Sequence, residues 1–165
     1  MPVLHLIVSA APPAQQVPEE IANLAADGWD VWVTCTPNAL AFLDRAAVER
    51  TSGHPVRVEN RTPGTADPRP PADAVAAAPV TLNTLAKWAL GINDNSAVGT
   101  LHEVTWVRAV PVVAGVWAKD ALRAHPEFDR YVARLDVAGV RFLPYGSGYD
   151  GFDWAELRTM LADTL

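Results

Sequence analysis

Residues 71–95, PADAVAAAPVTLNTLAKWALGINDN, decide the fold that we expect for this chain. Residues 74–78 form a short apolar run that Pro79 closes, and a polar turn over residues 80–84 follows it. A helix is then predicted from an apolar face at helical spacing, made of Leu85, Trp88, Ala89 and Ile92. In α/β proteins this order of strand, polar turn and helix often carries a ligand, because free backbone N–H groups meet where the strand ends. The stretch predicts either such a site or an ordinary turn.

The composition describes a globular chain, with 165 residues of which 50% are hydrophobic and 19% are charged. This length suits a single domain over residues 1–165. The net charge of −6 argues against nucleic acid or an anionic membrane surface as a partner. No apolar run reaches the ~20 residues of a membrane span, and the first residues lack the basic start of a signal peptide. We therefore expect a cytoplasmic protein.

Apolar runs separated by helical patterns predict the rest of the fold. Further strands are expected over residues 3–9, 30–35, 110–116 and 137–143, and a short one is suggested by Val56 and Val58. Helices are expected over 18–28, from 36 onward, over 97–107, in 118–134 and over 154–161. Strands that alternate with helices predict a three-layer α/β/α sandwich with a mostly parallel sheet, of flavodoxin or Rossmann type. Residues 60–71 are predicted to form an exposed loop.

The wording of residues 78–95 resembles one known family. APVTLNT (78–84) and GINDN (91–95) are similar to the Pro-Ala-Ser-Ala-Asn-Thr and Gly-Ile-x-Asp-Asn segments of the homo-oligomeric flavin-containing cysteine decarboxylases. Thr81 replaces the serine of the family and keeps its hydroxyl. The resemblance implies a flavoprotein domain that binds FMN, with Pro79, Thr81, Asn83 and Thr84 at the flavin. Without it, Thr81 or Asn83 would be read only as the N-cap of a helix.

Two other strand ends are implied to hold the flavin phosphate. TPNA (36–39) is similar to the family's Thr-Pro-x-Ala segment, whose threonine hydroxyl contacts that phosphate. Thr36 also fits an N-cap followed by proline, and the two roles are compatible. Ser9 falls where the family has Thr-Gly-Ser, but here the glycine and the second hydroxyl residue are missing. A phosphate contact and a plain loop both remain open for Ser9.

The catalytic motifs of the family are not retained. Its histidine would fall near residues 64–66, which contain none, and His54 lies in a stretch that resembles a spacer. A lone histidine in a loop is more often solvated than a base. The substrate-binding asparagine of the family is replaced by Lys119, which either holds an anion as a point charge or is a solvated helix residue. His54 and Lys119 are the two candidates for a catalytic role. Cys35, the only cysteine, is expected to be a buried strand residue, and no metal site is expected.

The retained flavin segment and the altered substrate side favour an FMN-binding redox enzyme that acts on an unidentified small molecule or peptide. The alternatives are a decarboxylase of phosphopantothenoylcysteine or a C-terminal peptidyl-cysteine, and a non-enzymatic regulatory protein that keeps the fold. Because relatives build the flavin site between subunits, we expect a homo-oligomer, a trimer or a dodecamer, with the flavin at a subunit interface. Some of the six tryptophans are expected at such interfaces.

Overall fold

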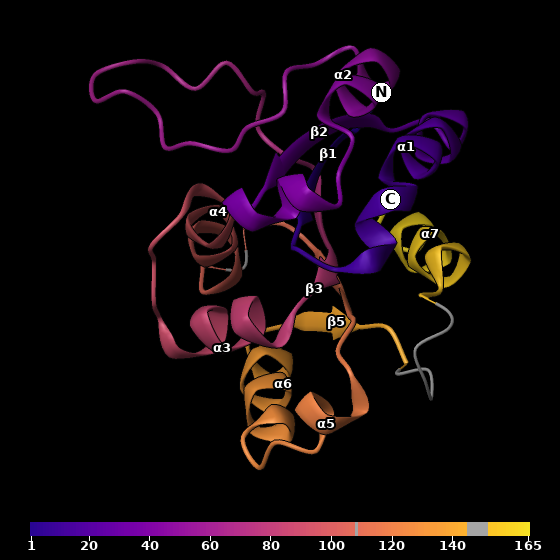
Figure 1. Cartoon of the computed structure of the whole chain (residues 1–165). Helices are drawn as coiled ribbons and strands as arrows, with labels where there is room; N and C mark the ends of the chain where they lie inside the picture. The colour runs from indigo at the N-terminus through magenta and orange to yellow at the C-terminus, as the bar shows by residue number, and fades with distance from the viewer. Residues whose placement is uncertain (108, 145–151) are drawn as a thin grey trace.

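A single parallel sheet organises the chain. The computed structural model describes residues 1–107, 109–144 and 152–165. Its strands are β1 (Val3–Val8), β2 (Asp30–Cys35), β3 (Ala74–Val80), β4 (Val112–Val116) and β5 (Val140–Phe142). They pair in parallel in the order β2-β1-β3-β4-β5, a flavodoxin-like order (Figure 1). The predicted three-layer α/β fold is confirmed.

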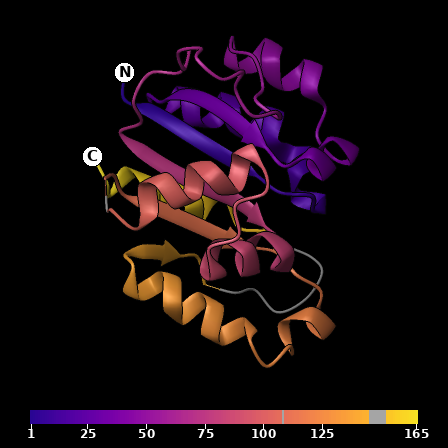
Figure 2. The same cartoon turned by 90° about the vertical axis from the view of Figure 1, so that its left-hand side faces the viewer.

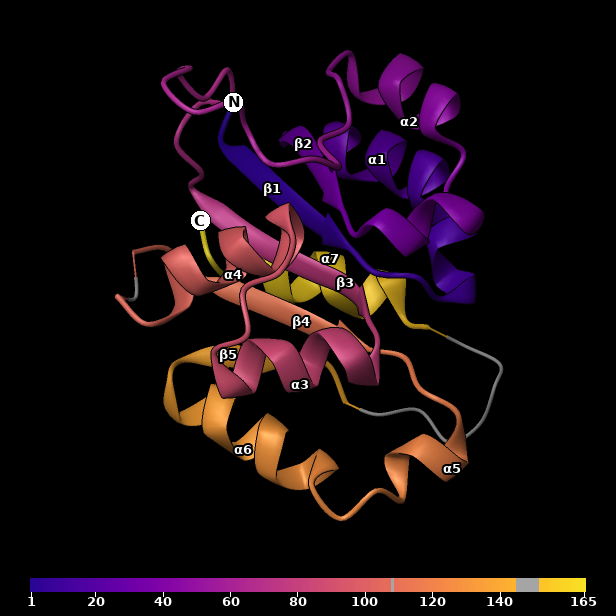
Figure 3. The same cartoon turned by 60° about the vertical axis from the view of Figure 1, so that its left-hand side comes forward.

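Helices cover both faces of the sheet. One face carries α3 (Leu82–Leu90), α4 (Ser96–Thr105) and α6 (Phe128–Val137). In Figure 2, α3 and α4 lie in front of the strands and α6 lies below them, beside β5. The opposite face carries α1 (Val17–Ala26), α7 (Trp154–Ala162) and, beside α1, α2 (Arg45–Ser52) (Figure 3). The short helices are η1 (Pro12–Gln16), η2 (Pro37–Ala41) and α5 (Asp120–Arg123). Within the described ranges, none of the helices combines the length and apolar composition needed to cross a bilayer.

Each face of the sheet has its own core, because neighbouring strand residues point to opposite sides. Leu4 and Leu6 of β1 belong to the core under α1 and α7, whereas Ile7 belongs to the core under α3, α4 and α6. Every residue of β3 is buried, so β3 reads as one apolar run in the sequence. This burial explains why the strands were predictable from apolar runs alone.

The strand that leads into α3 is longer than predicted. β3 continues through Pro79, whose peptide bond with Ala78 is cis, to Val80. Its register with β4 shifts between Ala77 and Val80, and such an irregularity accommodates a proline that has no N–H for the ladder. The helix α3 then begins at Leu82, directly after Thr81, which is the first of the two predicted N-cap candidates.

Two details of the helix predictions are wrong. The sequence predicts a break near Gly91, and Gly91 does end α3 in a left-handed conformation with φ 80°, but Ile92 then lies outside the helix and is 46% exposed, not on its apolar face. The helix expected from residue 36 onward is only the 3-10 helix η2. A separate helix, α2, follows because the Asp44 carboxylate accepts a hydrogen bond from the N–H of Ala47 at 3.0 Å and caps it.

The long connection between α2 and β3 is a loop, as predicted for residues 60–71, and it is the wide excursion in Figure 1. Val56 and Val58 do not form the short strand that their pattern suggests. Only Arg57 pairs with β2: its N–H donates to the carbonyl of Val33 at 3.0 Å, and its carbonyl accepts from Cys35 at 2.9 Å. The sheet therefore gains a single bridge along its β2 edge.

Gly115 of β4 allows Phe152, just before α7, to pack directly on the strand. A β-carbon at position 115 would lie 2.3 Å from Cζ of Phe152, much closer than any van der Waals contact. We expect Gly115→Ala to displace this ring and to lower the free energy of unfolding by about 1–3 kcal/mol, measured by urea denaturation. Adding Phe152→Leu should restore part of the loss. A Gly115→Ala variant as stable as the wild type would contradict the packing.

Candidate functional site

A cavity of about 200 Å³ lies where β1, β2 and β3 end. Ligands of open α/β sheets bind at this edge, outside the carboxyl ends of the strands. The lining residues are Ala10, Thr36, Pro37, Asn38, Thr81, Asn83, Thr84, Lys87, Asp94 and Asn95. They include four of the six residues predicted to contact the flavin: Thr36, Thr81, Asn83 and Thr84. The fold thus brings together the ends of β2 and β3, which are far apart in the sequence.

Thr36 presents an unused hydroxyl to this cavity. The residue is 7% exposed, and its backbone N–H donates to the carbonyl of Val8 at 2.9 Å. It occupies the N-cap position of η2, but its side chain makes no capping hydrogen bond. Among the residues that the structure describes, this hydroxyl has no hydrogen-bond partner, and its oxygen is not fully enclosed by the protein. It is therefore open to the cavity and can donate to a ligand oxygen there.

The first turn of α3 forms the opposite wall. Thr81 caps this helix, as predicted, because its Oγ1 accepts a hydrogen bond from the N–H of Thr84 at 3.2 Å. Asn83 is exposed at the cavity, and no hydrogen bond of its side-chain amide occurs within the described part of the chain. An amide both donates and accepts, so Asn83 suits a ligand with mixed polar atoms.

Ser9 and Pro79 lie next to the residues that line the cavity but do not line it themselves. Ser9 is 1% exposed, and its hydroxyl donates to Oγ1 of Thr84 at 3.0 Å. The N–H of Ser9 donates to the carbonyl of Pro79 at 3.0 Å, which ties the ends of β1 and β3 together. Neither residue lines the cavity. Their contacts fix the position of Thr84, which does.

Lys87 and Asp94 were not assigned to the site by sequence reasoning. Lys87 follows Asn83 by one helical turn, and this i, i+4 spacing is the signal that could have found it. Its Nζ lies 2.7 Å from Oδ2 of Asp94, so the cation in the wall is paired. Asn95 accepts a hydrogen bond from the N–H of Val98 at 3.0 Å and caps α4. The segment after Gly91 thereby becomes a fixed third wall.

The two candidates for a catalytic role lie outside the cavity. Nε2 of His54 is 2.6 Å from Oδ1 of Asp30, and its ring stacks on Trp32 with centroids 3.7 Å apart. Asp30 is the first residue of β2, whereas the cavity lies past the last, roughly 16 Å along the strand. Lys119 follows β4 at the cavity edge of the sheet, but it is exposed before α5 and does not line the cavity.

Cys35 is the buried strand residue that the sequence predicts. Its side chain is fully buried, and this burial raises the pKa of the thiol to about 11. A thiol with such a pKa stays protonated at neutral pH, and the thiolate is the reactive form. Cys35 is therefore a core residue next to Thr36.

Comparisons with known proteins agree with this geometry. The profile of the flavoprotein family matches residues 2–143, so the chain belongs to the flavoprotein family. The predicted resemblance is confirmed. A comparison with curated proteins found no match.

Similar solved structures include the FMN-dependent cysteine decarboxylase SpaF, with 25% identity, a TM-score of 0.79, and 99% of this chain and 97% of that chain covered. A PPC decarboxylase mutant complexed with pantothenoylaminoethenethiol has 19% identity and a TM-score of 0.76, with coverage of 98% and 96%. HAL3 from Cryptococcus neoformans has 20% identity and a TM-score of 0.78, with coverage of 99% and 95%. At 19% and 20% identity, the last two similarities show that these proteins share the fold of this chain.

Proposed function

We propose that the protein binds FMN in the cavity at the ends of β1, β2 and β3, and that it is a redox enzyme acting on a small molecule or peptide. The observation that carries this proposal is the hydroxyl of Thr36, which makes no hydrogen bond among the described residues and opens onto the cavity that the first turn of α3 also lines. The N-terminus of α3 adds free N–H groups and the positive end of a helix dipole, which suit a phosphate. The similar structures SpaF and TvaF are FMN-dependent, and AtHal3 is an FMN binding protein.

The residues of the cavity fit the groups of FMN. The hydroxyl of Thr36 can donate to a phosphate oxygen, and the amides of Asn38 and Asn83 can pair with ribityl hydroxyls or the ring edge. Lys87, held by Asp94, keeps that wall neutral overall. When bound, FMN supplies an acceptor for two electrons, and the chain supplies the orientation of the substrate toward it. The polar side chains at the ends of these strands would give the cofactor its position.

A second copy of the chain is proposed to complete the site. A cavity of about 200 Å³ is smaller than the ~300–1,000 Å³ typical of cofactor sites, so it holds only part of FMN. Apolar side chains are exposed near the ends of α3 and α4: Leu90, Ile92 and Trp106 are each about half exposed. Such groups favour burial between subunits. This supports the trimer or dodecamer with the flavin at an interface, and native mass spectrometry would measure the subunit number.

Cysteine-derivative decarboxylation is the second candidate function, favoured by the likeness to SpaF. Against it stand residues 64–66, which hold no histidine, and Lys119, which replaces the asparagine of the motif. Incubation with phosphopantothenoylcysteine or a peptide ending in cysteine, followed by mass spectrometry, separates the two. Loss of carbon dioxide would establish the decarboxylase. A regulatory protein without enzymatic activity is the third candidate function. It would be supported if the purified protein is colourless and does not bind added FMN.

Asn83→Ala is expected to weaken FMN binding about tenfold, because it removes a side-chain hydrogen bond worth about 1 kcal/mol or more. The measurement is a titration of flavin-free protein with FMN, followed by quenching of flavin fluorescence. His54→Ala is the control, because His54 contacts Asp30 at the far end of β2. The His54→Ala variant should bind FMN with the affinity of the wild type. Equal occupancy in the two variants would contradict the site assignment.

A further inference from the structure

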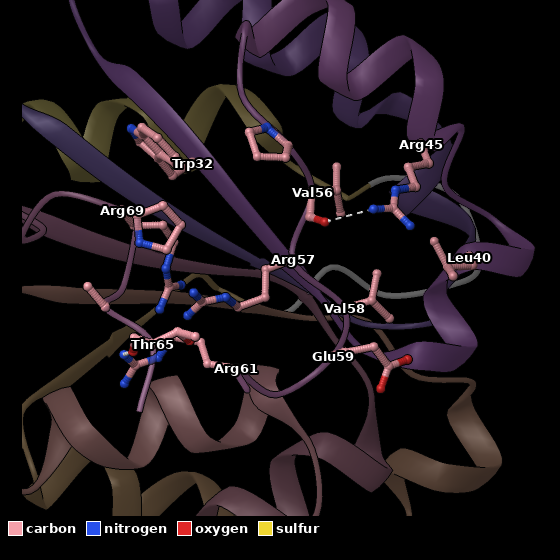
Figure 4. A pocket seen from close by; sticks show the side chains of 13 residues that line it. Trp32, Leu40, Arg45, Val56, Arg57, Val58, Glu59, Arg61, Thr65 and Arg69 are labelled. Carbon is pink, nitrogen blue, oxygen red and sulfur yellow. Dashed lines mark hydrogen bonds between the residues drawn. The ribbon is translucent and has the colours of Figure 1, made fainter. Parts of the chain in front are cut away.

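A second cavity, of about 410 Å³, lies between the loop after α2 and the outer strand β2 (Figure 4). Its apolar lining, here called the apolar wall, includes Trp32 on one side of Arg57 and Leu40 and Val58 on the other in Figure 4. Its basic lining consists of Arg57, Arg61 and Arg69. This volume falls in the range of ligand sites, about 300–1,000 Å³. The cavity shares no lining residue with the proposed flavin site. We name it the arginine pocket.

The guanidinium groups of this pocket are built into the fold. Asp67 accepts two hydrogen bonds from Arg57, at 2.9 and 2.8 Å. It also accepts two from the side chain of Arg69, at 3.2 and 2.9 Å. Arg69 further donates to Oγ1 of Thr34 at 2.8 Å, and its side chain is only 7% exposed. Arg57 and Arg69 are therefore held in place before any ligand arrives.

Positive charge exceeds negative charge on this wall. Asp67 is shared by Arg57 and Arg69, and Arg61 approaches the same carboxylate only to 4.0 Å. His5 adds no charge, because its burial and the neighbouring Arg69 lower the pKa of its ring to about 4. Glu59 also lines the pocket, but its carboxylate points away from the guanidiniums in Figure 4.

Across the pocket, the positive charge of Arg45 is already balanced by the carboxylate of Glu49. Its Nε lies 3.0 Å from Glu49, and it donates to the carbonyl of Val56 at 3.2 Å. Glu103 of α4 lines a neighbouring polar cavity together with Arg57, Arg61 and Arg69, but among the described residues it forms no ion pair with them. With Asp67 and Glu59 counted in full, the three arginines keep one net positive charge, which Glu103 offsets only from beyond ion-pair distance.

Donors remain available on the arginines. Within the described part of the chain, the side chains of Arg57, Arg61 and Arg69 make six hydrogen bonds. Each guanidinium carries about five N–H donors in a planar fork that matches the oxygens of a carboxylate or phosphate. Arg61 uses one donor, for the carbonyl of Thr65 at 2.9 Å, and is 46% exposed.

We propose that the arginine pocket binds an organic anion: a carboxylate or phosphate group at the guanidiniums, carried on an apolar body that lies against Trp32, Leu40 and Val58. The shared chemistry is an anion with an apolar tail. A bare anion would meet the arginines but leave the apolar wall empty, and a neutral apolar molecule would leave the excess charge unpaired. The ligand therefore needs both parts.

The test is isothermal titration calorimetry of the full-length protein as purified. Hexanoate and phenyl phosphate are the two probes with an apolar tail, and they distinguish a ligand with a carboxylate group from a ligand with a phosphate group. Acetate and inorganic phosphate are the corresponding anions without a tail. We expect at least one tailed probe to bind, and to bind more tightly than its bare counterpart. Arg61→Gln should weaken that binding about tenfold.

Arg50→Gln is the matched control, because Arg50 is an exposed arginine of α2 that does not line the pocket. Its affinity for the probe should equal that of the wild type, and both variants should melt at the wild-type temperature. Failure of both tailed probes to bind at millimolar concentration would overturn the proposal, as would equal binding by Arg61→Gln. Equal affinity for tailed and bare anions would overturn the role of the apolar wall. Arg61→Gln separates this pocket from the proposed flavin site, because a phosphate probe that binds at the flavin site would keep its affinity in that variant.

Discussion

Trp88→Ala is expected to lower the free energy of unfolding by about 3–5 kcal/mol, among the largest losses that one substitution in this chain can cause. Trp88 is fully buried between α3 and the sheet, and its indole N–H donates to Oγ1 of Thr105 at 3.0 Å. Alanine would leave a large cavity and remove the side-chain link from α3 to α4. Urea denaturation, with the midpoint and slope both recorded, measures the effect.

Trp106→Ala is the matched control, because Trp106 lies just after α4 and is 47% exposed. We expect a stability change of about 0.5 kcal/mol or less in the dissociated chain. Trp88→Ala should also weaken FMN binding, since α3 carries Asn83 and Thr84 on its cavity side. Similar losses in the two variants would contradict the buried position of Trp88.

Asp67→Asn is expected to cost about 2–3 kcal/mol of stability. It removes the carboxylate between two largely buried guanidiniums, Arg57 and Arg69, and losing one partner of a buried pair costs about 3–5 kcal/mol. The lower figure applies because the Asp67 side chain is 31% exposed. Asp163→Asn is the control: its pair with Arg141 is exposed and 3.7 Å long, so about 0–1 kcal/mol is expected.

The loss caused by Asp67→Asn should depend on pH. Burial opposes the charge of Asp67, but the hydrogen bonds from Arg69 and Arg57 outweigh it and hold the pKa of the carboxyl well below its usual range. A depressed pKa in the folded state stabilises the fold above the unfolded value of about 3.9. The difference between wild type and variant should therefore be full at pH 7 and shrink as the pH falls below about 4. A difference that grows in acid would contradict the ion pair.

The sheet was predictable because burial on both faces leaves its strands as apolar runs. β2 was predicted with its bounds, and the cap of α3 was narrowed to Thr81 or Asn83, from local residues alone; the structure has Thr81. The end of β3 was not predicted, because a proline usually closes a strand. Only the pairing of β3 with β4 as far as Val80 shows that Pro79 lies inside the strand. Ile92 matched the apolar face of α3, yet Gly91 ends the helix one residue before it.

The candidate site was predictable only where a motif carried it. Thr36, Thr81, Asn83 and Thr84 came from the resemblance, and the fold places them around one cavity. Asp94 was not assigned, because its contact with Lys87 spans a loop whose path no periodicity predicts. The arginine pocket left no signal either. Its charges are scattered through an irregular segment, and only the folded chain brings them to one carboxylate.

The bridge between Arg57 and β2 bears on the solubility of the protein. β2 and β5 are the edges of the sheet, and an open edge can pair with the edge of another molecule. β5 is only three residues long, which limits such pairing, whereas six-residue β2 is covered on its outer side at one point, where Arg57 bridges it. Asp67 anchors Arg57 through its guanidinium. We therefore expect loss of this ion pair to free the loop and to leave the edge of β2 more open to pairing with another molecule.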